Sequence, residues 1–189
     1  MEMNMARDTK AKIIAAAANV AVARGVQNLT MEAVAEEAGI SKGGVFYHFG
    51  SKQELLLGMV QALVDITEKE VSAAQAQDHE AGSWLRGFIR ACLTNSAEDL
   101  GPVGRLSVAF LTAAANDTTL LAPMNERQPA WREAINTSGI DPVQAQIVRL
   151  AADGLWINDV MGVPVLDAAE RAAVIERLEA MTRKDTEPE

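Results

Sequence analysis

The sequence predicts an all-α protein of about nine helices, and three observations carry this prediction. Helix-forming residues, alanine above all, are abundant, whereas the chain holds only three Trp, one Tyr and four Phe. Glycine and proline stand singly or in short pairs between segments whose apolar residues recur three or four positions apart. With 189 residues, 49% of them hydrophobic, the chain is long enough to bury a real core, so disorder is not the expected state.

Three short helices are expected in the N-terminal part of the chain. The first covers residues 9–24 and ends at Gly25, because glycine commonly follows the last turn of a helix. Thr30 is a good cap for the second helix, over residues 31–38, which Gly39 terminates. Ser41 opens the third, which runs to about Phe49.

A long helix over residues 52–77 follows, because residues 51–54 read Ser-Lys-Gln-Glu, the pattern of a capping box. Further helices are expected over residues 83–92, 102–116, 142–160 and 168–181. Pro123 and Pro129 fall in the segment between residues 116 and 142, and they must start, kink or interrupt any helix there. We therefore divide the chain into a three-helix head, residues 1–50, and a second helical domain, residues 51–189.

The charge is distributed unevenly along the chain. Residues 1–57 hold six basic and six acidic side chains, so the rest of the chain carries the whole formal charge of −9. A neutral head on an acidic body is expected where only the head approaches a polyanion, since repulsion from the body helps to orient it. An ordinary solvated acidic surface explains the charges equally well.

Several classes of protein are disfavoured by what the chain lacks. Cys92 is the single cysteine, and the only histidines are His48 and His79, so neither a disulfide nor a metal site is expected. No nucleophile motif or glycine-rich phosphate loop occurs, and we expect neither an enzyme nor a cofactor. Without a signal peptide or a run of roughly 18 apolar residues, a cytoplasmic protein with no membrane partner is expected.

The two short helices around Gly39 are typical of a helix-turn-helix, in which the second helix enters the major groove of DNA. The surrounding residues resemble the TetR family of bacterial transcriptional regulators. The family pattern has Thr before the second helix, Ala-x-x-Ala-Gly at the turn, Tyr-x-His-Phe and then Ser-Lys-x-x-Leu. Residues 29–55 read LTMEAVAEEAGISKGGVFYHFGSKQEL, and the match is specific over roughly residues 8–60.

The resemblance implies a set of DNA contacts in the head. Thr30 would bond a phosphate, and Tyr47, His48 and Lys52 would grip backbone phosphates. The residues that would face the groove are Ser41, Lys42, Gly43, Gly44 and Val45, although Val45 could also seal the small core of the head together with Ile40. Arg7, Lys10 and Lys12 form an arm before the first helix that could add to sequence choice.

Some of these assignments have alternatives. The two glycines cost about 1 kcal/mol each in a helix, which favours a close approach of backbone to DNA, but a simple loop would also explain them. Phe46 stands where the family usually has tyrosine, so Tyr47 either replaces that hydroxyl or only packs its ring, and Phe46 itself reads as core. His48 could brace its helix instead of touching phosphate.

For the second domain the resemblance implies a homodimer and a small-molecule pocket. The last two helices would form the seam, through Val143, Ile147, Leu150, Ala151, Gly154, Val174, Leu178 and Met181. Candidate pocket residues are Trp84, Phe88, Cys92, Phe110, Trp131 and Trp156. Both sets could instead be plain core. Because no cluster of buried charge is evident, we expect a fairly apolar or neutral effector.

The sequence thus predicts a ligand-responsive regulator, expected to act as a repressor, that binds a palindromic double-stranded DNA operator as a homodimer and is released by a small-molecule effector. Activation is open as well, because the position of the operator is not a property of the chain. The alternative is a helical ligand-binding or interaction protein that has lost DNA affinity.

Overall fold

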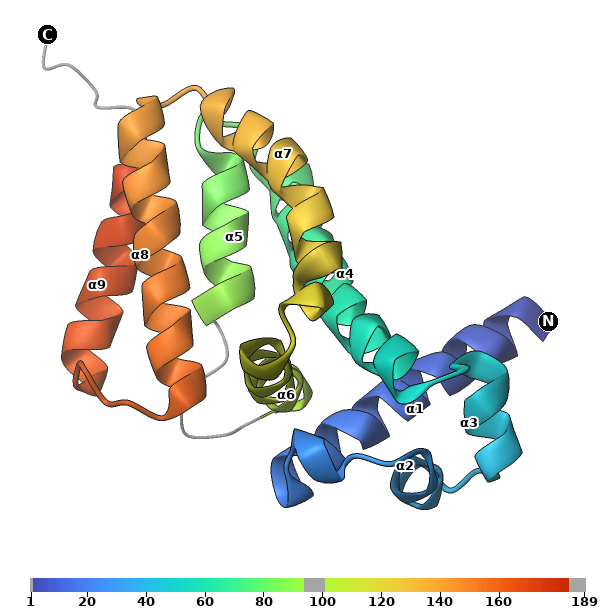
Figure 1. Ribbon diagram of the computed structural model, residues 1–189. Coiled ribbons are helices and arrows are strands. Elements are labelled where there is room, and N and C mark those ends of the chain that lie inside the picture. The colour runs from blue at the N-terminus through green and yellow to red at the C-terminus, as the bar shows by residue number, and fades with distance from the viewer. Residues whose placement is uncertain (1, 94–100, 184–189) are drawn as a thin grey trace, which may run out of the picture. The chain divides into compact units, whose positions relative to one another are not determined.

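The structure, a computed structural model, describes residues 2–93 and 101–183, and every regular element in these two stretches is helical (Figure 1). The nine α-helices described there are α1 (Glu2–Arg24), α2 (Met31–Ala38), α3 (Lys42–His48), α4 (Lys52–Gln77), α5 (Ser83–Leu93), α6 (Pro102–Asn116), α7 (Ala122–Asn136), α8 (Pro142–Met161) and α9 (Ala168–Met181). Two 3-10 turns, η1 (Val26–Asn28) and η2 (Thr118–Leu121), complete them. The predicted all-helical class is confirmed.

Two helices differ from the expected bounds. The first, α1, begins at Glu2, well before Thr9. In α7 the ring of Pro129 lies inside a continuous helix, and Pro123 occupies its first turn, where a missing backbone N–H costs little. The residues that the sequence left ambiguous therefore form one helix.

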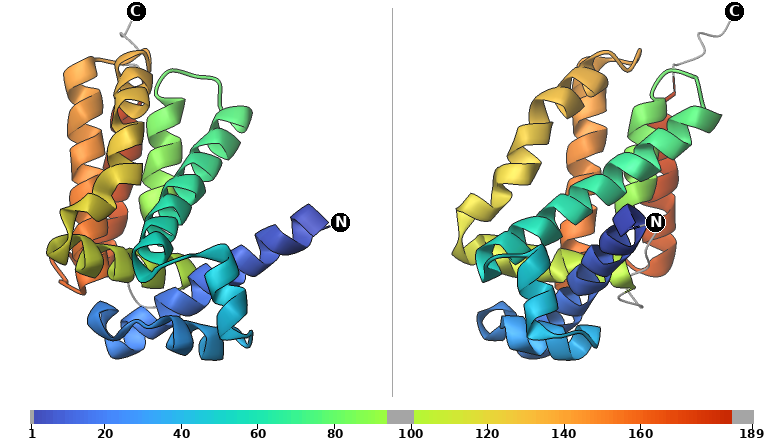
Figure 2. Two further views of the ribbon diagram at one scale, coloured as in Figure 1. Left: turned by 45° about the vertical axis from the view of Figure 1, so that its right-hand side comes forward. Right: turned by 90° about the vertical axis from the view of Figure 1, so that its right-hand side faces the viewer.

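The chain divides into two compact units, and the first combines Met1–Val64 with Leu100–Glu126. Here α1 packs against α2 and also against α6, and α2 packs against α3; the arrangement can be followed in Figures 1 and 2. The core of this unit contains apolar side chains from all these helices, including Ile13, Val34, Val45, Leu55, Met59 and Phe110. The sequence did not indicate that α6 packs on the head.

The second unit combines Asp65–Asp99 with Arg127–Glu189. Here α5 packs against both α8 and α9, which also pack against each other. Its core includes Leu85, Ile89, Ile135, Val148, Ala152 and Leu178.

A buried arginine ties three segments of the second unit together. The guanidinium of Arg86, which is 1% exposed, donates to both carboxylate oxygens of Asp78, at 2.6 and 2.9 Å. It also donates to the carbonyl and hydroxyl oxygens of Thr182, both at 3.0 Å. The hydrogen bond from Arg86 lowers the pKa of Asp78 to about 2, so this carboxylate is ionised at neutral and mildly acidic pH.

Candidate nucleic-acid interface and ligand cleft

The turn between α2 and α3 has the geometry that the sequence predicted. Thr30 caps α2, its Oγ1 accepting a hydrogen bond from the Ala33 amide at 3.1 Å. Gly39 ends α2 in the left-handed conformation, with φ of 62°, and the Ile40 amide donates back to the Ala35 carbonyl at 3.0 Å. Glycine adopts this conformation without steric cost, which is why the chain reverses here.

The second helix of the pair, α3, presents one face to solvent. Ser41 caps it, accepting from the Gly44 amide at 3.1 Å, so the two glycines lie in a helix and not in a loop. Lys42 and Gly43 are exposed, and Tyr47 is 84% exposed. A Cβ added at Gly43 would meet only the Ser41 hydroxyl, at 3.9 Å. No packing within the described chain therefore requires glycine at this position.

Two neighbouring residues of α3 have the opposite roles from those expected. The resemblance implied that Val45 faces the groove, but its side chain is 0% exposed and fills the core of the head, which was the alternative role. Phe46, which was interpreted as core, is 42% exposed. The assignment of Val45 is wrong because the helix needs one buried residue to attach it to the head, and the register selects Val45.

Lys42 is held beside an acidic residue of the preceding helix. Its ammonium forms an ion pair with Glu32 of α2 and lies 5.6 Å from the centre of the Phe46 ring. The hydrogen bond from Lys42 lowers the pKa of Glu32. Both side chains are more than half exposed, so the lysine can leave this carboxylate for another anion.

Lys52 begins α4, as expected, but its ammonium points back at the chain. It donates to the carbonyl oxygens of Val26 and Gln27, at 2.8 and 3.2 Å. Half of the expected capping box is present, since Ser51 Oγ accepts from the Glu54 amide, but the Glu54 carboxylate accepts from the amide of Gly50, one residue before the cap. Lys52 therefore braces the turn η1 as well as adding charge near the head.

His48 lies at the end of α3, half-buried, with its ring edge-on to Tyr47 at 5.2 Å. It borders an open hollow of about 420 Å³ on the first unit, together with Lys10 and Phe49. The Lys10 ammonium lies 5.5 Å from the centre of the Phe49 ring. Arg7, Lys10 and Lys12, which were expected in an arm before the first helix, lie within α1, and all three are exposed.

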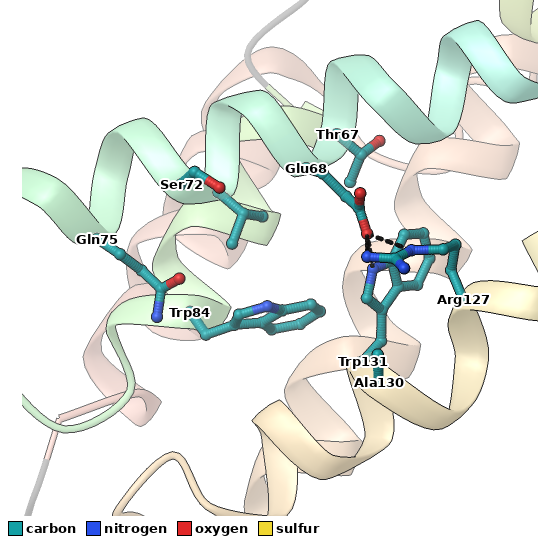
Figure 3. Close-up of a pocket in the computed structure, with 9 residues that line it drawn as sticks. Thr67, Glu68, Ser72, Gln75, Trp84, Arg127, Ala130 and Trp131 are labelled. Atoms are coloured by element: carbon teal, nitrogen blue, oxygen red, sulfur yellow. Dashed lines mark hydrogen bonds and ion pairs between the residues drawn. The ribbon is translucent and has the colours of Figure 1, made fainter.

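The second unit brings together three of the predicted pocket residues. Trp84 and Phe88 stack on each other with ring centres 5.3 Å apart, and Trp131 lies 6.4 and 6.2 Å from them. A cleft of about 230 Å³ opens beside this cluster, bordered by Trp84 and Trp131 and by the polar side chains of Thr67, Glu68, Ser72, Gln75 and Arg127 (Figure 3).

Phe88 does not border the cleft, and the three remaining predicted pocket residues are not in it either. Phe110 lies on α6 and is buried in the first unit, so it does not belong to the cluster. Trp156, on α8, and Cys92, on α5, are half-buried in the second unit, and neither borders the cleft. Burial and the nearby Asp153 raise the pKa of the Cys92 thiol to about 12, against the opposing effect of Arg149, so it stays protonated.

The aromatic cluster is backed by a charged pair that sequence reasoning missed. The guanidinium of Arg149, a residue that is 9% exposed, lies 4.9 Å from the centre of the Phe88 ring and 5.2 Å from that of Trp131. It pairs with Asp153 at 3.3 Å, while burial raises the pKa of this carboxyl. The premise that no charge is buried near the pocket is therefore wrong. The spacing of four residues between Arg149 and Asp153, which allows an ion pair on one face of a helix, was the signal in the sequence that could have revealed this pair.

The predicted dimer residues divide into exposed and buried ones. Val143, Ile147 and Leu150 of α8 are 67%, 51% and 67% exposed, and Ala151 is exposed too. Gly154, Val174 and Met181 are half-buried. Leu178 is 5% exposed, so it belongs to the core of its own unit, as the alternative interpretation had it, and not to a free seam.

A helix-turn-helix with an exposed second helix, combined with a helical unit that contains a cleft, defines a class of DNA-binding regulators. Residues 13–59 match the family described as bacterial regulatory proteins, tetR family, and residues 82–183 match the one described as tetracyclin repressor-like, C-terminal domain. The chain belongs to the TetR family of transcriptional regulators, a family without enzymatic activity.

Individual relatives agree with this assignment. The HTH-type transcriptional regulator TtgR of Pseudomonas putida is 33% identical over 73 residues, which are 39% of this chain and 35% of that protein. The match thus covers only a minor part of the curated relative. No helix in the described stretches is long and apolar enough to cross a membrane.

Solved structures extend the likeness in fold over nearly the whole chain. A transcriptional regulator from Rhodococcus sp. Rha1 superposes with a TM-score of 0.72 at 20% identity, over 92% of this chain and 95% of that one. A structure described as the multidrug binding protein EbrR complexed with imidazole has a TM-score of 0.60 at 22% identity, over 95% and 92%.

Proposed function

We propose that this regulator binds a palindromic DNA operator as a homodimer and that a small molecule, bound in the second unit, releases it and so relieves repression. The observation that carries the proposal is the exposed face of α3, where Lys42 and Tyr47 flank a glycine whose Cβ position is open to an approaching surface.

In the proposed complex α3 lies in the major groove. Lys42 exchanges Glu32 for a guanine edge or a phosphate, and the exposed ring of Phe46 contacts a thymine methyl. Backbone phosphates are contacted by Thr30, whose hydroxyl lies at the start of α2, and by Tyr47, His48 and Lys52, while Ser41 and Gly44 face the groove.

The proposed homodimer uses α8. Most of the large exposed apolar side chains in the described part of the chain lie between Val143 and Val165. Those on α8 recur alternately four and three positions apart once Gly154 is included, which is the spacing of a helix that packs lengthwise on another: Val143, Ile147, Leu150, Gly154, Ile157 and Met161. Such a strip is costly to leave in water, and a two-fold partner covers it.

The ligand is proposed to occupy the cleft beside Trp84 and Trp131. Clefts with aromatic walls and a few polar groups are the usual form of small-molecule sites. The description of EbrR as a multidrug binding protein supports a ligand site in this fold.

The test is selection of genomic DNA fragments by the purified protein at near-physiological salt, followed by sequencing. Recovery of a palindrome, with affinity that falls steeply as salt rises, is expected. Lys42→Ala should weaken and broaden the selection, whereas Lys69→Ala, which removes an exposed charge from the second unit, should leave it unchanged. A folded protein that retains nothing above background would instead indicate a ligand-binding protein with a vestigial head.

A further inference from the structure

The cleft of the second unit contains one carboxylate, and two residues of α7 hold it. Glu68 of α4 accepts hydrogen bonds at the same oxygen, Oε1, from Nε of Arg127 at 2.6 Å and from the indole N–H of Trp131 at 3.1 Å (Figure 3). The guanidinium of Arg127 also forms an ion pair with this oxygen through its Nη2. These contacts link segments that lie 59 and 63 residues apart in sequence.

The two partners of Glu68 are not equally fixed. Trp131 is 5% exposed and its ring is packed against Trp84 and Phe88, so its N–H stays where it is. The side chain of Arg127 is 44% exposed and long, and an ion pair at such a surface is weak enough to exchange. Arg127 therefore acts as a replaceable cation on a carboxylate that Trp131 keeps in position.

The rest of the lining favours a cation over an anion. Trp84 and Trp131 offer indole rings, which attract positive charge, and Thr67, Ser72 and Gln75 are neutral. The Arg149 guanidinium behind Trp131 is already compensated by Asp153. An anion would have to take Arg127 away from Glu68 and would then lie beside the unpaired Glu68 carboxylate. Loss of the ion pair and repulsion between the two negative charges are both unfavourable.

We propose that the cleft binds a compact aromatic organic cation, whose charge replaces the Arg127 guanidinium on Glu68 while its ring contacts the two indoles. The proposal deepens the proposed ligand-responsive function and rests on it. The volume of about 230 Å³ lies below the range of about 300–1,000 Å³ that is common for drug-sized ligands, so the ligand is small.

The test uses three probes of similar shape and different charge on the whole protein, without DNA, at mildly alkaline pH: N-methylquinolinium, neutral quinoline and 1-naphthoate. Binding is followed by the indole N–H signals in NMR. The three tryptophans give three such signals. The signal that is missing in Trp131→Phe is assigned to Trp131. The cation should bind about ten-fold more tightly than quinoline and should shift the Trp131 signal most.

Two substitutions separate a cation site from an anion site. Glu68→Gln should abolish the preference for the cation, and Arg127→Gln should tighten cation binding about two- to five-fold, because the competing guanidinium is gone. Arg132→Gln, on the exposed side of the same helix, is the matched control and should change nothing. The dispersion of the NMR signals shows whether each variant is folded. If Glu68→Gln does not fold, Arg127→Gln still tests the proposal.

Three outcomes would overturn the proposal: equal binding of cation and neutral probe, tighter binding of naphthoate that Arg127→Gln removes, or no binding of any probe by the folded protein. Because DNA is absent, these results are independent of the operator selection. A protein that binds the cation but no DNA leaves the cleft assignment standing and rejects the proposed operator binding.

Discussion

The ammonium of Lys52 donates a hydrogen bond of 2.8 Å to the carbonyl oxygen of Val26, across a sequence separation of 26 residues. A second bond, of 3.2 Å, reaches the next carbonyl, that of Gln27. A lysine that the sequence suggested as a phosphate contact thus also holds the start of α4 to the turn that follows α1. Its removal has two consequences, one for stability and one for DNA.

Lys52→Met keeps the aliphatic stem and removes the charge. We expect the free energy of unfolding to fall by about 1–2 kcal/mol, since hydrogen bonds from a charged donor to backbone carbonyls are lost. Affinity for all DNA sequences should fall together with it. Thermal unfolding and DNA titration on the same preparation check this, and an unchanged melting temperature would show that the brace is unimportant.

Glu32→Gln releases Lys42 from its ion pair and removes a negative charge from the proposed interface. Affinity for the operator should rise about two- to five-fold, with a steeper dependence on salt. Glu36→Gln, an exposed acidic residue on the same helix, is the matched control for the loss of charge alone. Equal gains from both variants would mean that the pairing of Glu32 with Lys42 does not matter.

Gly43→Ala should separate stability from function. A Cβ here meets no other part of the described chain more closely than 3.9 Å, so the free protein should gain about 0.5–1 kcal/mol from the better helix former. Operator binding should weaken at least several-fold, because the methyl group occupies the space into which DNA comes. Higher thermal stability with unaltered binding would place the DNA elsewhere.

Leu150→Glu introduces a charge at the centre of the exposed strip on α8. The association constant of the homodimer should fall at least about ten-fold, because the carboxylate is desolvated in the seam. Ala76→Glu, at an exposed position of α4, should leave the mass measured by sedimentation equilibrium unchanged. A dimer that persists in the first variant would exclude this face.

The ion pair of Asp78 with Arg86 predicts a pH dependence. The folded pKa of Asp78, about 2, is below the ordinary value of 3.8, so the pair contributes its full stability above about pH 4 and loses it as pH falls toward 2. Asp78→Asn should cost about 2–4 kcal/mol at neutral pH, because it leaves a buried guanidinium without its counter-charge. The difference from the parent protein should shrink in acid.

Urea unfolding at neutral pH and near pH 3 measures this difference. Glu80→Gln, which removes the exposed partner of Arg183, serves as the comparison and should have almost no effect at either pH. A cost for Asp78→Asn that is the same at both values would assign it to packing and not to charge.

Local patterns indicated where most of the helices begin and end, although α1 begins at Glu2 and not at Thr9. Thr30, Gly39, Ser41 and Ser51 marked where helices begin and end, because each of them satisfies or redirects backbone groups only a few positions away. The fold class and the helix-turn-helix followed from such signals. The family resemblance added the roles.

Only the tertiary structure decided which side chains are available and which meet. The choice between Val45 and Phe46 depends on the rotation of α3 against the head, and the burial of Leu178 depends on its neighbours α5 and α8. Glu68 and Arg127 lie 59 residues apart, and no periodicity connects them. Helix caps are local interactions that the sequence states directly, whereas a cleft arises from packing between distant helices, whose register short-range patterns do not encode.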